Sequence, residues 1–350
     1  MQYNSGRDFW WLLLRPWIAI PRLIQVLWTL GGLVIVLLLR GSSSNADVQC
    51  GLARRILNTL TGLGPCFIKL GQALSTRPDL VRRDWLEELT RLQDDLPAFP
   101  HSIALARIEK ELGAPADQLF EEFPSAPIAA ASLGQVYKAR LEGQAWVAVK
   151  VQRPNLTFIL RRDLVLIRAL GVLTAPFLPL NLGFGLGSII DEFGRSLFEE
   201  IDYEQEADNA ERFASLFVDN PAVYVPRVER MLSSTRVLTT TWIEGSKMRD
   251  SQELIEQRLD PAALIRTGVI CGLQQLLEFG YFHADPHPGN LFALQGRSGD
   301  MGHVGYVDFG MMDTISDSDR LTLTGAVVHL INRDFAGLAE DFQNLGFLTP

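Results

Sequence analysis

The chain contains few cysteines. Cys50, Cys66 and Cys271 are the only three in 350 residues, and they are odd in number and widely spaced. Such a set provides neither a disulfide framework nor the closely spaced ligand pairs of a zinc site. It excludes a small disulfide-stabilised secreted domain and fits a reducing compartment.

The chain lacks net positive charge outside the N-terminus. The net charge of the chain is −9, yet residues 1–60 carry six arginines against Asp8 and Asp47, which makes this segment +4 and the remainder −13. An acidic body argues against a nucleic-acid-binding surface. The basic N-terminal segment instead suits the head groups of anionic lipids.

One long hydrophobic run stands out, at residues 23–39. It is free of charge over seventeen residues and lies between Arg22 and Arg40. As a helix it would be about 26 Å long, slightly less than the hydrocarbon core of a bilayer. Trp17 and Trp28 supply aromatic side chains of the kind found at membrane interfaces. The run therefore predicts membrane association, either spanning the bilayer or lying on it, with packing against a partner as the alternative.

The pattern of apolar residues predicts a mixed chain of helices and strands. Gly41–Asn45 is a linker by composition, and a β-hairpin is expected in 128–152 with its turn at Glu142-Gly143. Two further strands are expected near 290–294 and 303–307. Helices are expected in 47–113, 156–173, 188–217 and 261–280.

Two polar motifs in the last third of the chain carry the chemistry. His283 to Asn290 has the spacing H-x-D-x-x-x-x-N, and Asp308-Phe309-Gly310 follows eighteen residues later. In protein kinases, such a pair provides a catalytic aspartate and the ligands of Mg²⁺. We therefore expect Asp285 to orient the nucleophile, and Asn290 and Asp308 to hold metal.

A kinase site also needs a strand lysine and a carboxylate partner. Val147 to Lys150 reads V-A-V-K, which matches the strand whose lysine holds the α- and β-phosphates. Glu206 is the preferred partner of Lys150 and Glu200 the second choice. Asp202 and Glu206 are four residues apart and are expected to share a helix face.

The glycine-rich loop of kinases is missing. In its place the chain has Ala129-Ala130-Ala131-Ser132-Leu133-Gly134, and alanine restricts the backbone more than glycine does. We expect this loop to grip a nucleotide differently. The other candidate nucleotide-binding residues, Trp242 and Glu244, lie where an expected strand runs into a loop.

These motifs together resemble the UbiB family of atypical protein-kinase-like proteins, also called ADCK or aarF-domain kinases. Phe67 to Gln72 is similar to the K-x-G-Q motif of that family, and Ala129 to Val136 is similar to its alanine-rich loop. Glu200-Ile-Asp202 resembles its E-x-D motif. His283 to Asn290 is similar to its catalytic loop.

The resemblance implies an α+β, bilobal protein-kinase-like fold with a helical N-terminal extension. The chain departs from the family pattern because only forty residues follow Gly310, so a truncated C-lobe is expected. It implies that the extension folds over the active site, with Lys69 and Gln72 pointing into the nucleotide pocket. The expected divisions are a membrane-associating segment, the K-x-G-Q extension, an N-lobe and a short C-lobe. They cover residues 1–45, 46–115, 116–245 and 246–350.

The resemblance also implies a function in prenylquinone metabolism, either ubiquinone or plastoquinone and tocopherol. The expected activity is an atypical kinase or ATPase that uses ATP or ADP with Mg²⁺. The expected partners are a prenylquinone precursor or related lipid, a membrane surface and quinone-biosynthesis enzymes, with no nucleic acid. The active site is expected in a reducing compartment, which is the cytoplasm, stroma or matrix.

Two alternatives remain open at this point. One is a nucleotide-regulated protein that binds or presents a lipid without significant turnover. The other is a true Ser/Thr protein kinase, which would require an open groove beside Asp285.

Overall fold

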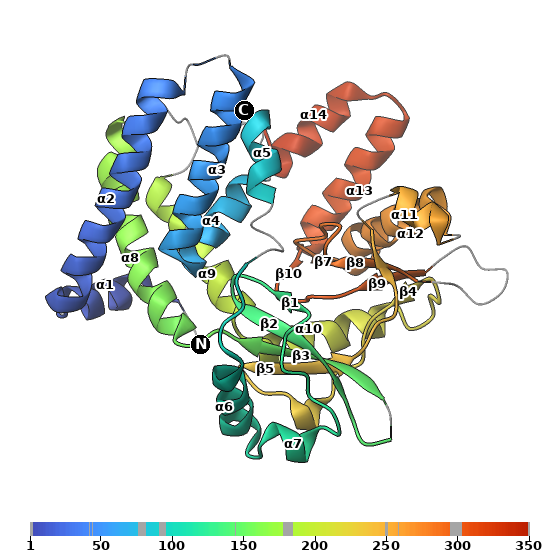
Figure 1. The fold of residues 1–350 in the computed structure, drawn as a ribbon. Coiled ribbons are helices and arrows are strands. Elements are labelled where there is room, and N and C mark those ends of the chain that lie inside the picture. Colours follow the sequence, from blue (N-terminus) through green and yellow to red (C-terminus); the bar gives the residue numbers. More distant parts are fainter. Residues whose placement is uncertain are drawn as a thin grey trace. The chain divides into compact units, whose positions relative to one another are not determined.

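The computed structural model describes most of the chain, and it forms two compact units. The described residues are 3–41, 43, 45–75, 82–90, 96–143, 145–177, 185–248, 251–257, 259–294 and 303–348. Unit 1 contains residues 1–204 and 229–239, and unit 2 contains residues 205–228 and 240–350 (Figure 1).

The first part of unit 1 is helical. Its helices are α1 (Ser5–Leu13), α2 (Pro16–Arg40), α3 (Ala46–Leu63), α4 (Pro65–Ser75), α5 (Arg83–Thr90), α8 (Leu156–Thr174) and α9 (Leu186–Glu200). Asn4 and Asn45 accept backbone N–H groups at the starts of α1 and α3, so both helices are capped by a side chain. Leu60, Phe67, Leu164 and related residues of these helices form one buried cluster.

A buried ion pair holds α2 to α8. Arg22 donates two hydrogen bonds to Asp163, from Nε at 2.9 Å and from Nη2 at 2.7 Å, and both side chains are almost fully buried. The same guanidinium reaches the Leu63 carbonyl oxygen at the end of α3. The sequence had suggested that the basic residues of this segment contact lipid head groups. Arg22 is not available for such a contact, because its side chain is buried inside the protein.

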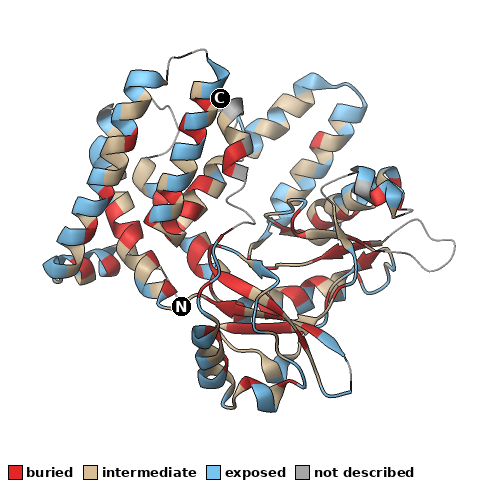
Figure 2. Ribbon diagram, viewed as in Figure 1, coloured by how far each residue is buried: buried red, intermediate tan, exposed pale blue. Residues whose placement is uncertain are grey.

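The second part of unit 1 is a small antiparallel sheet with two helices. Its elements are α6 (His101–Leu112), α7 (Ala116–Leu119), β1 (Ala129–Ala130), β2 (Gly134–Arg140), β3 (Trp146–Gln152) and β5 (Val237–Thr241). The strand order is β1-β2-β3-β5, and the pairs β1–β2 and β2–β3 are antiparallel. Alternate residues Val147, Val149 and Val151 are buried in one cluster with residues of α6. The burial colours of Figure 2 show that much of this sheet is buried. The predicted hairpin is therefore present.

The helix expected in 188–217 is interrupted. α9 ends at Glu200 and α10 (Tyr203–Leu216) begins three residues later. At the junction, Gln152 donates to the Ile201 carbonyl oxygen at 2.6 Å, and the Tyr203 N–H donates to the Thr235 carbonyl at 3.2 Å. These backbone groups are bonded outside the helix, which breaks it. The prediction that Asp202 and Glu206 share a helix face is therefore wrong, because Asp202 precedes α10.

Unit 2 combines two small sheets with helices. Its elements, besides most of α10, are β4 (Val223–Tyr224), β6 (Ser246–Lys247), α11 (Ser251–Glu256), α12 (Pro261–Leu273), a π-helix (Gln274–Phe279), β7 (Tyr281–His283), β8 (Leu291–Leu294), β9 (His303–Tyr306), β10 (Met312–Thr314), α13 (Asp317–Ile331) and α14 (Phe335–Asn344). The sheets have the orders β4-β9-β8-β6 and β10-β7. Phe213 packs against Phe217, Tyr306 and Phe309 at centroid distances of 4.9–5.3 Å.

The kinase-like α+β fold predicted from the sequence is confirmed. The predicted strands at 290–294 and 303–307 are present as β8 and β9. The four domain boundaries and the truncated C-lobe stay predictions.

The buried Arg22–Asp163 pair leads to a stability prediction. Asp163→Asn leaves the guanidinium of Arg22 buried without its counter-charge, and we expect the free energy of unfolding to fall by about 3–5 kcal/mol. Chemical denaturation in mild detergent measures this loss. The control is Glu192→Gln, which removes an exposed ion pair with Arg195 and should change stability little. Equal stabilities of the two variants would contradict the buried pair.

Candidate active site

The strand lysine lies in unit 1. Lys150 is in β3, between the buried Val149 and Val151, and its Cα is opposite Val136 of β2. Its Nζ lies 5.0 Å from the centroid of the Tyr203 ring, which is fully buried. A cation over the face of an aromatic ring is stabilised electrostatically. The hairpin and Tyr203 therefore position the lysine that the sequence predicted to contact phosphates.

The alanine-rich loop is a tight turn between β1 and β2. The Ala131 N–H donates to the Gly134 carbonyl at 2.8 Å. A Cβ at position 134 would lie 2.8 Å from the Val151 carbonyl oxygen and 2.6 Å from the Tyr203 hydroxyl, so only glycine fits there. Ala129 and Ala131 are exposed and Ser132 is buried. The alanines, rather than the Ser132 hydroxyl, thus form the outer surface of the loop.

Arg153 holds this loop from the side. Its Nε donates to the Ala131 carbonyl at 3.0 Å, its Nη2 donates to the Pro97 carbonyl at 2.8 Å, and its backbone N–H donates to Leu133. Burial lowers the pKa of its guanidinium from the ordinary value. Arg153 was not predicted, because nothing in the local sequence pattern shows that a residue after β3 bonds to residues 22 and 56 positions earlier.

The predicted gating residue Lys69 is paired. It lies in α4, one turn before Gln72, and its Nζ forms an ion pair with the Glu200 carboxylate at the end of α9. Both side chains are largely shielded, at 15% and 12% exposure. The structure thus brings together the K-x-G-Q and E-x-D motifs, which are 131 residues apart. Glu206, the preferred partner of Lys150, is buried in α10, and its pairing with Lys150 stays a prediction.

The catalytic loop lies in unit 2, where His283 organises it. This residue ends β7 and is 5% exposed. Its Nδ1 accepts the Asp285 N–H at 3.1 Å, and its Nε2 lies 2.8 Å from the Asp308 carbonyl oxygen. Because a carbonyl oxygen can only accept, Nε2 carries the proton of a neutral imidazole. Burial lowers the pKa of His283, which favours this neutral form.

Hydrogen bonds also connect Asn290 and Asp308 to the catalytic loop. Asn290 Nδ2 donates to the Asp285 carbonyl at 3.2 Å, and its own carbonyl accepts the Val307 N–H at 3.0 Å. Asp308 has a left-handed backbone with φ of 65°, which few non-glycine residues adopt outside special sites. Within one unit, His283 thus joins Asp285 to Asp308, and Asn290 is joined to Asp285.

Two amide side chains from other helices support these residues, and Gln275 is buried while Asn209 is half-buried. Gln275 lies in the π-helix, and its Oε1 accepts the His283 N–H at 2.9 Å. Asn209 of α10 donates to the Phe309 carbonyl at 2.9 Å and accepts from the Tyr281 hydroxyl at 3.0 Å. Neither residue was predicted from the sequence. A π-helix leaves no clear periodic signal, and the contact of Asn209 spans 100 residues.

The predicted nucleotide-binding loop 242–245 adjoins the catalytic loop within unit 2. β6, which directly follows it, pairs with β8, the strand that starts after Asn290. A Cβ at Gly245 would lie 2.6 Å from the Ala293 carbonyl oxygen, so the loop packs closely on this strand. Glu244 is exposed and Trp242 is half-buried. Their contact with nucleotide stays a prediction.

The donor set suits magnesium rather than a soft metal. Among the described residues, no group of three or more His, Cys, Asp or Glu side chains converges on a point. Asn290 and Asp308 offer one amide and one carboxylate oxygen. Mg²⁺ is typically bound by one or two carboxylates together with substrate phosphates. These residues therefore fit a metal that arrives with a nucleotide.

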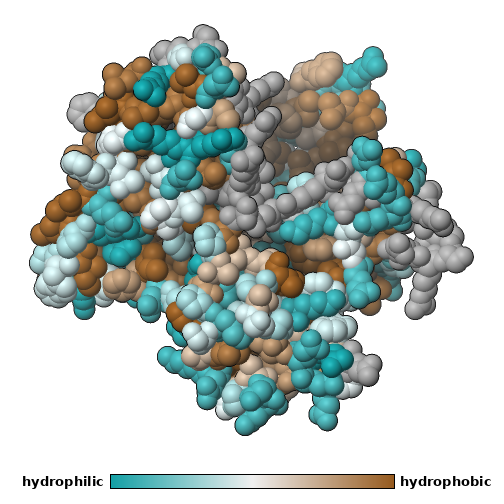
Figure 3. Space-filling view, in the orientation of Figure 1, coloured by the Kyte–Doolittle hydropathy of each residue, from teal (hydrophilic) through white to brown (hydrophobic). Residues whose placement is uncertain are grey.

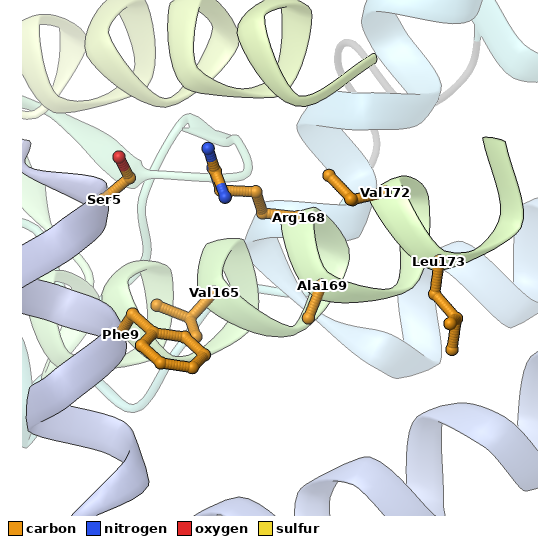
Figure 4. A pocket seen from close by; sticks show the side chains of 7 residues that line it. All are labelled: Ser5, Phe9, Val165, Arg168, Ala169, Val172 and Leu173. Atoms are coloured by element: carbon orange, nitrogen blue, oxygen red, sulfur yellow. The ribbon is translucent and has the colours of Figure 1, made fainter. Parts of the chain in front are cut away.

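A cavity of about 270 Å³ lies elsewhere in unit 1, between α1 and α8 (Figure 4). Apolar side chains such as Phe9, Val165 and Leu173 line it, and its one charged residue, Arg168, is paired with Asp191 at 2.8 Å. It has no carboxylate lining for a metal–phosphate group, so it is distinct from the candidate site.

Known proteins resemble this chain over most of its length. Residues 91–342 match the model of the ABC1 atypical kinase-like domain. An uncharacterised protein of Synechocystis sp. is 49% identical over 351 residues, which cover 100% of this chain and 61% of that protein. The chloroplastic protein ACTIVITY OF BC1 COMPLEX KINASE 1 of Arabidopsis thaliana is 43% identical over 339 residues, or 94% of this chain and 48% of that protein. The chain thus spans about half to three fifths of these relatives.

A solved structure with a similar fold supports this family. The Rv3197 protein of Mycobacterium tuberculosis, in complex with erythromycin, superimposes with a TM-score of 0.54 at 29% identity, and the match covers 78% of this chain and 68% of that chain. The family predicted from the sequence motifs is thereby confirmed. By its motifs, its fold and its match over residues 91–342, the chain belongs to the ABC1 atypical kinase-like family, also known as UbiB.

Proposed function

We propose that the protein binds ATP or ADP with Mg²⁺ and acts as an atypical kinase or ATPase. The observation that carries this proposal is the double contact of His283, which joins Asp285 to Asp308 in one unit. Phosphoryl transfer requires one group to orient the nucleophile and another to hold the metal. The bridged pair supplies both.

Within this mechanism, Asp285 orients the attacking hydroxyl or water. Its carboxylate is 39% exposed and lies 3.7 Å from His287 Nε2, so it is accessible to a nucleophile. Asn290 uses Nδ2 to hold the Asp285 carbonyl, so its Oδ1 is the atom that would coordinate the ion together with Asp308. Bound Mg²⁺ would neutralise charge that develops on the transferred phosphoryl group.

The residues of unit 1 would position the phosphates. Lys150 would contact the α- and β-phosphates, and the turn from Ala129 to Ser132 would cover them. Since Glu200 is paired with Lys69, we keep Glu206 as the partner of Lys150. Gln72, together with Lys69, would control access to the nucleotide. Trp242 and Glu244 would contact the nucleotide from unit 2.

For the physiological function, we propose support of prenylquinone synthesis at a membrane in a reducing compartment. The family resemblance supports this function, and the chloroplastic relatives from Arabidopsis thaliana support the compartment. The proposed membrane location is supported by α2, whose length and composition would be sufficient to cross a membrane. A prenylquinone precursor and the enzymes that process it would be the partners.

A second function is favoured by one contact. The Lys69–Glu200 ion pair engages two predicted active-site side chains with each other. If this state persists with nucleotide bound, turnover is suppressed and the protein acts as a nucleotide-regulated lipid-binding protein. Nucleotide binding by the unmodified protein without measurable hydrolysis would select this second function.

The carboxylates provide the main test of the proposed function. We expect Asp308→Asn and Asp285→Asn each to lower Mg²⁺-dependent ATP hydrolysis at least about 10²-fold, since a metal ligand or an orienting base is lost. Titration with a fluorescent ADP analogue should show that Mg²⁺ strengthens binding to the parent but not to Asp308→Asn. The control is Asp219→Asn, an exposed turn residue of the same unit. Retained hydrolysis in Asp308→Asn would overturn the assignment of the metal site.

The neutral state of His283 predicts an acid-sensitive catalytic loop. The folded pKa of His283 lies below its ordinary value of 6.5, so the unfolded chain takes up the proton first as the pH falls. The stabilising contribution is complete above about pH 6.5 and is lost as the pH decreases towards the folded pKa. Protonation also removes the Nδ1 acceptor of the Asp285 N–H. We expect hydrolysis and amide protection of Asp285 to fall together as the pH decreases through the folded pKa of His283, which lies below 6.5.

The matched variants isolate this effect. Gln can donate to the Asp308 carbonyl and accept from Asp285 without titrating, so His283→Gln should keep partial activity and flatten the acid limb of the pH profile. His329→Gln, on α13, should leave the limb unchanged. An unchanged acid limb in His283→Gln would show that another group controls it.

A further inference from the structure

The outer face of α2 is a continuous apolar stripe. Exposed residues recur every three, four or seven positions and therefore lie on one side of the helix. They are Trp17, Ile20, Ile24, Trp28, Ile35 and Leu38, with exposed fractions of 54–84%. Figure 3 shows hydrophobic side chains along the edge of unit 1 where α2 lies. A stripe along a 25-residue helix exceeds the scattered exposed apolar residues of ordinary soluble proteins.

The opposite face of α2 is fixed to the protein. Arg22, Val26 and Leu33 are its buried residues, and they are spaced on the side facing away from the stripe. The Arg22–Asp163 pair ties this side to α8. Lipid therefore has access to only one side of the helix.

This attachment argues against a bilayer-spanning α2. If α2 crossed the hydrocarbon core, the helices packed against it would have to enter as well. α3 exposes Arg54 and Arg55, and α8 carries Arg161 and Arg162. Each charged residue at the centre of a bilayer costs about 2.5–3.5 kcal/mol or more. A helix lying along the lipid surface avoids this cost, because only its outer face is immersed.

The surrounding charge favours lipid over a protein partner. Arg15 and Arg40 flank the stripe, and Arg40 is exposed. Arg22 is buried, but four other arginines of residues 1–60, namely Arg7, Arg40, Arg54 and Arg55, are exposed, whereas the rest of the chain has a net charge of −13. Basic residues beside a charge-free apolar face match anionic head groups above acyl chains. Trp17 and Trp28 add the aromatic side chains typical of the interface.

The apolar surface extends from α2 onto α1 and α8. Phe9, Trp10 and Leu13 of α1 are exposed at 45%, 62% and 53%. Phe9 borders the cavity of Figure 4, whose other rim includes Leu173, exposed at 68%. The immersed surface would thus include a hollow lined by hydrocarbon side chains.

We propose that α1 and α2 form a monotopic docking surface for an anionic lipid bilayer, with α2 parallel to the membrane plane. The stripe from Trp17 to Leu38 enters the head-group and acyl boundary, while the Arg22–Asp163 pair holds unit 1 on the same side of the membrane. The inference rests on the proposed membrane location but not on ATP turnover.

Vesicle binding tests the surface. The full chain, without nucleotide, is sedimented with vesicles of phosphatidylcholine alone or mixed with phosphatidylglycerol. We expect preference for the anionic vesicles, and at least a tenfold loss of binding in the variant Ile24→Glu/Trp28→Glu/Ile35→Glu. The control Ile265→Glu/Val269→Glu/Leu321→Glu places the same charges at exposed apolar positions of unit 2 and should bind normally. Equal binding by both variants overturns the proposal.

ATP hydrolysis is measured separately on both variants without lipid. Since neither set of substitutions touches the candidate active site, hydrolysis should equal that of the parent. Lost vesicle binding with intact hydrolysis supports the docking surface alone. If the parent does not hydrolyse ATP, the proposed function fails while the binding result stands.

A depth measurement distinguishes lying from spanning. Trp17→Cys and Trp28→Cys, each in a Cys50→Ser background that leaves only the buried Cys66 and Cys271, carry an environment-sensitive dye. Brominated lipids report the depth of each dye. Eleven residues separate the sites by about 16 Å along the helix axis. Equal shallow depths support the proposal. A difference near 16 Å indicates spanning, and no quenching indicates a protein partner or second copy; either overturns it.

Discussion

The candidate site depends on the hydrogen bonds of one buried imidazole. The His283 ring accepts a hydrogen bond from the Asp285 backbone N–H and donates one to the Asp308 carbonyl oxygen. The backbone N–H of His283 donates to Gln275 Oε1. Each of the three contacts engages a backbone N–H or carbonyl group. They therefore fix the backbone positions of Asp285 and Asp308 and do not involve the two carboxylate groups. The carboxylates therefore remain able to contact metal and substrate, while the loops that carry them cannot move independently.

Much of this arrangement could be predicted from the sequence because it is encoded locally. The spacing of His283, Asp285 and Asn290 fixes a short loop, and the alternation around Lys150 fixes a strand. The supporting residues could not be predicted, because their contacts join segments far apart in the chain. Arg153 reaches back to Pro97, Asn209 reaches forward to Phe309, and Lys69 reaches Glu200. The break between α9 and α10 was missed for the same reason, since Gln152 and Thr235 cause it.

The two units contain different kinds of functional residues. Unit 2 gathers the catalytic loop, the D-F-G turn and the loop around Trp242 through its own strands and amides. Unit 1 contributes a lysine, a closed alanine-rich turn and helices that carry a large apolar exterior. Unit 1 therefore contains both the residues proposed to contact phosphates and those proposed to contact lipid. Its sheet and its helical part have separate buried clusters, so the two kinds of surface rest on different cores.

The π-helix after α12 has a consequence for how this family can vary. Its wider turns hold one residue more per hydrogen-bonded ring than an α-helix does, and this extra residue aims Gln275 at His283. Deleting any single residue between Gln274 and Phe279 would let the segment return to regular α-helix. The helix would then enter β7 rotated by about 100°. Length changes are usually tolerated near helix ends, but here chain length itself is a determinant of the active site, and lineages that retain the chemistry should conserve it.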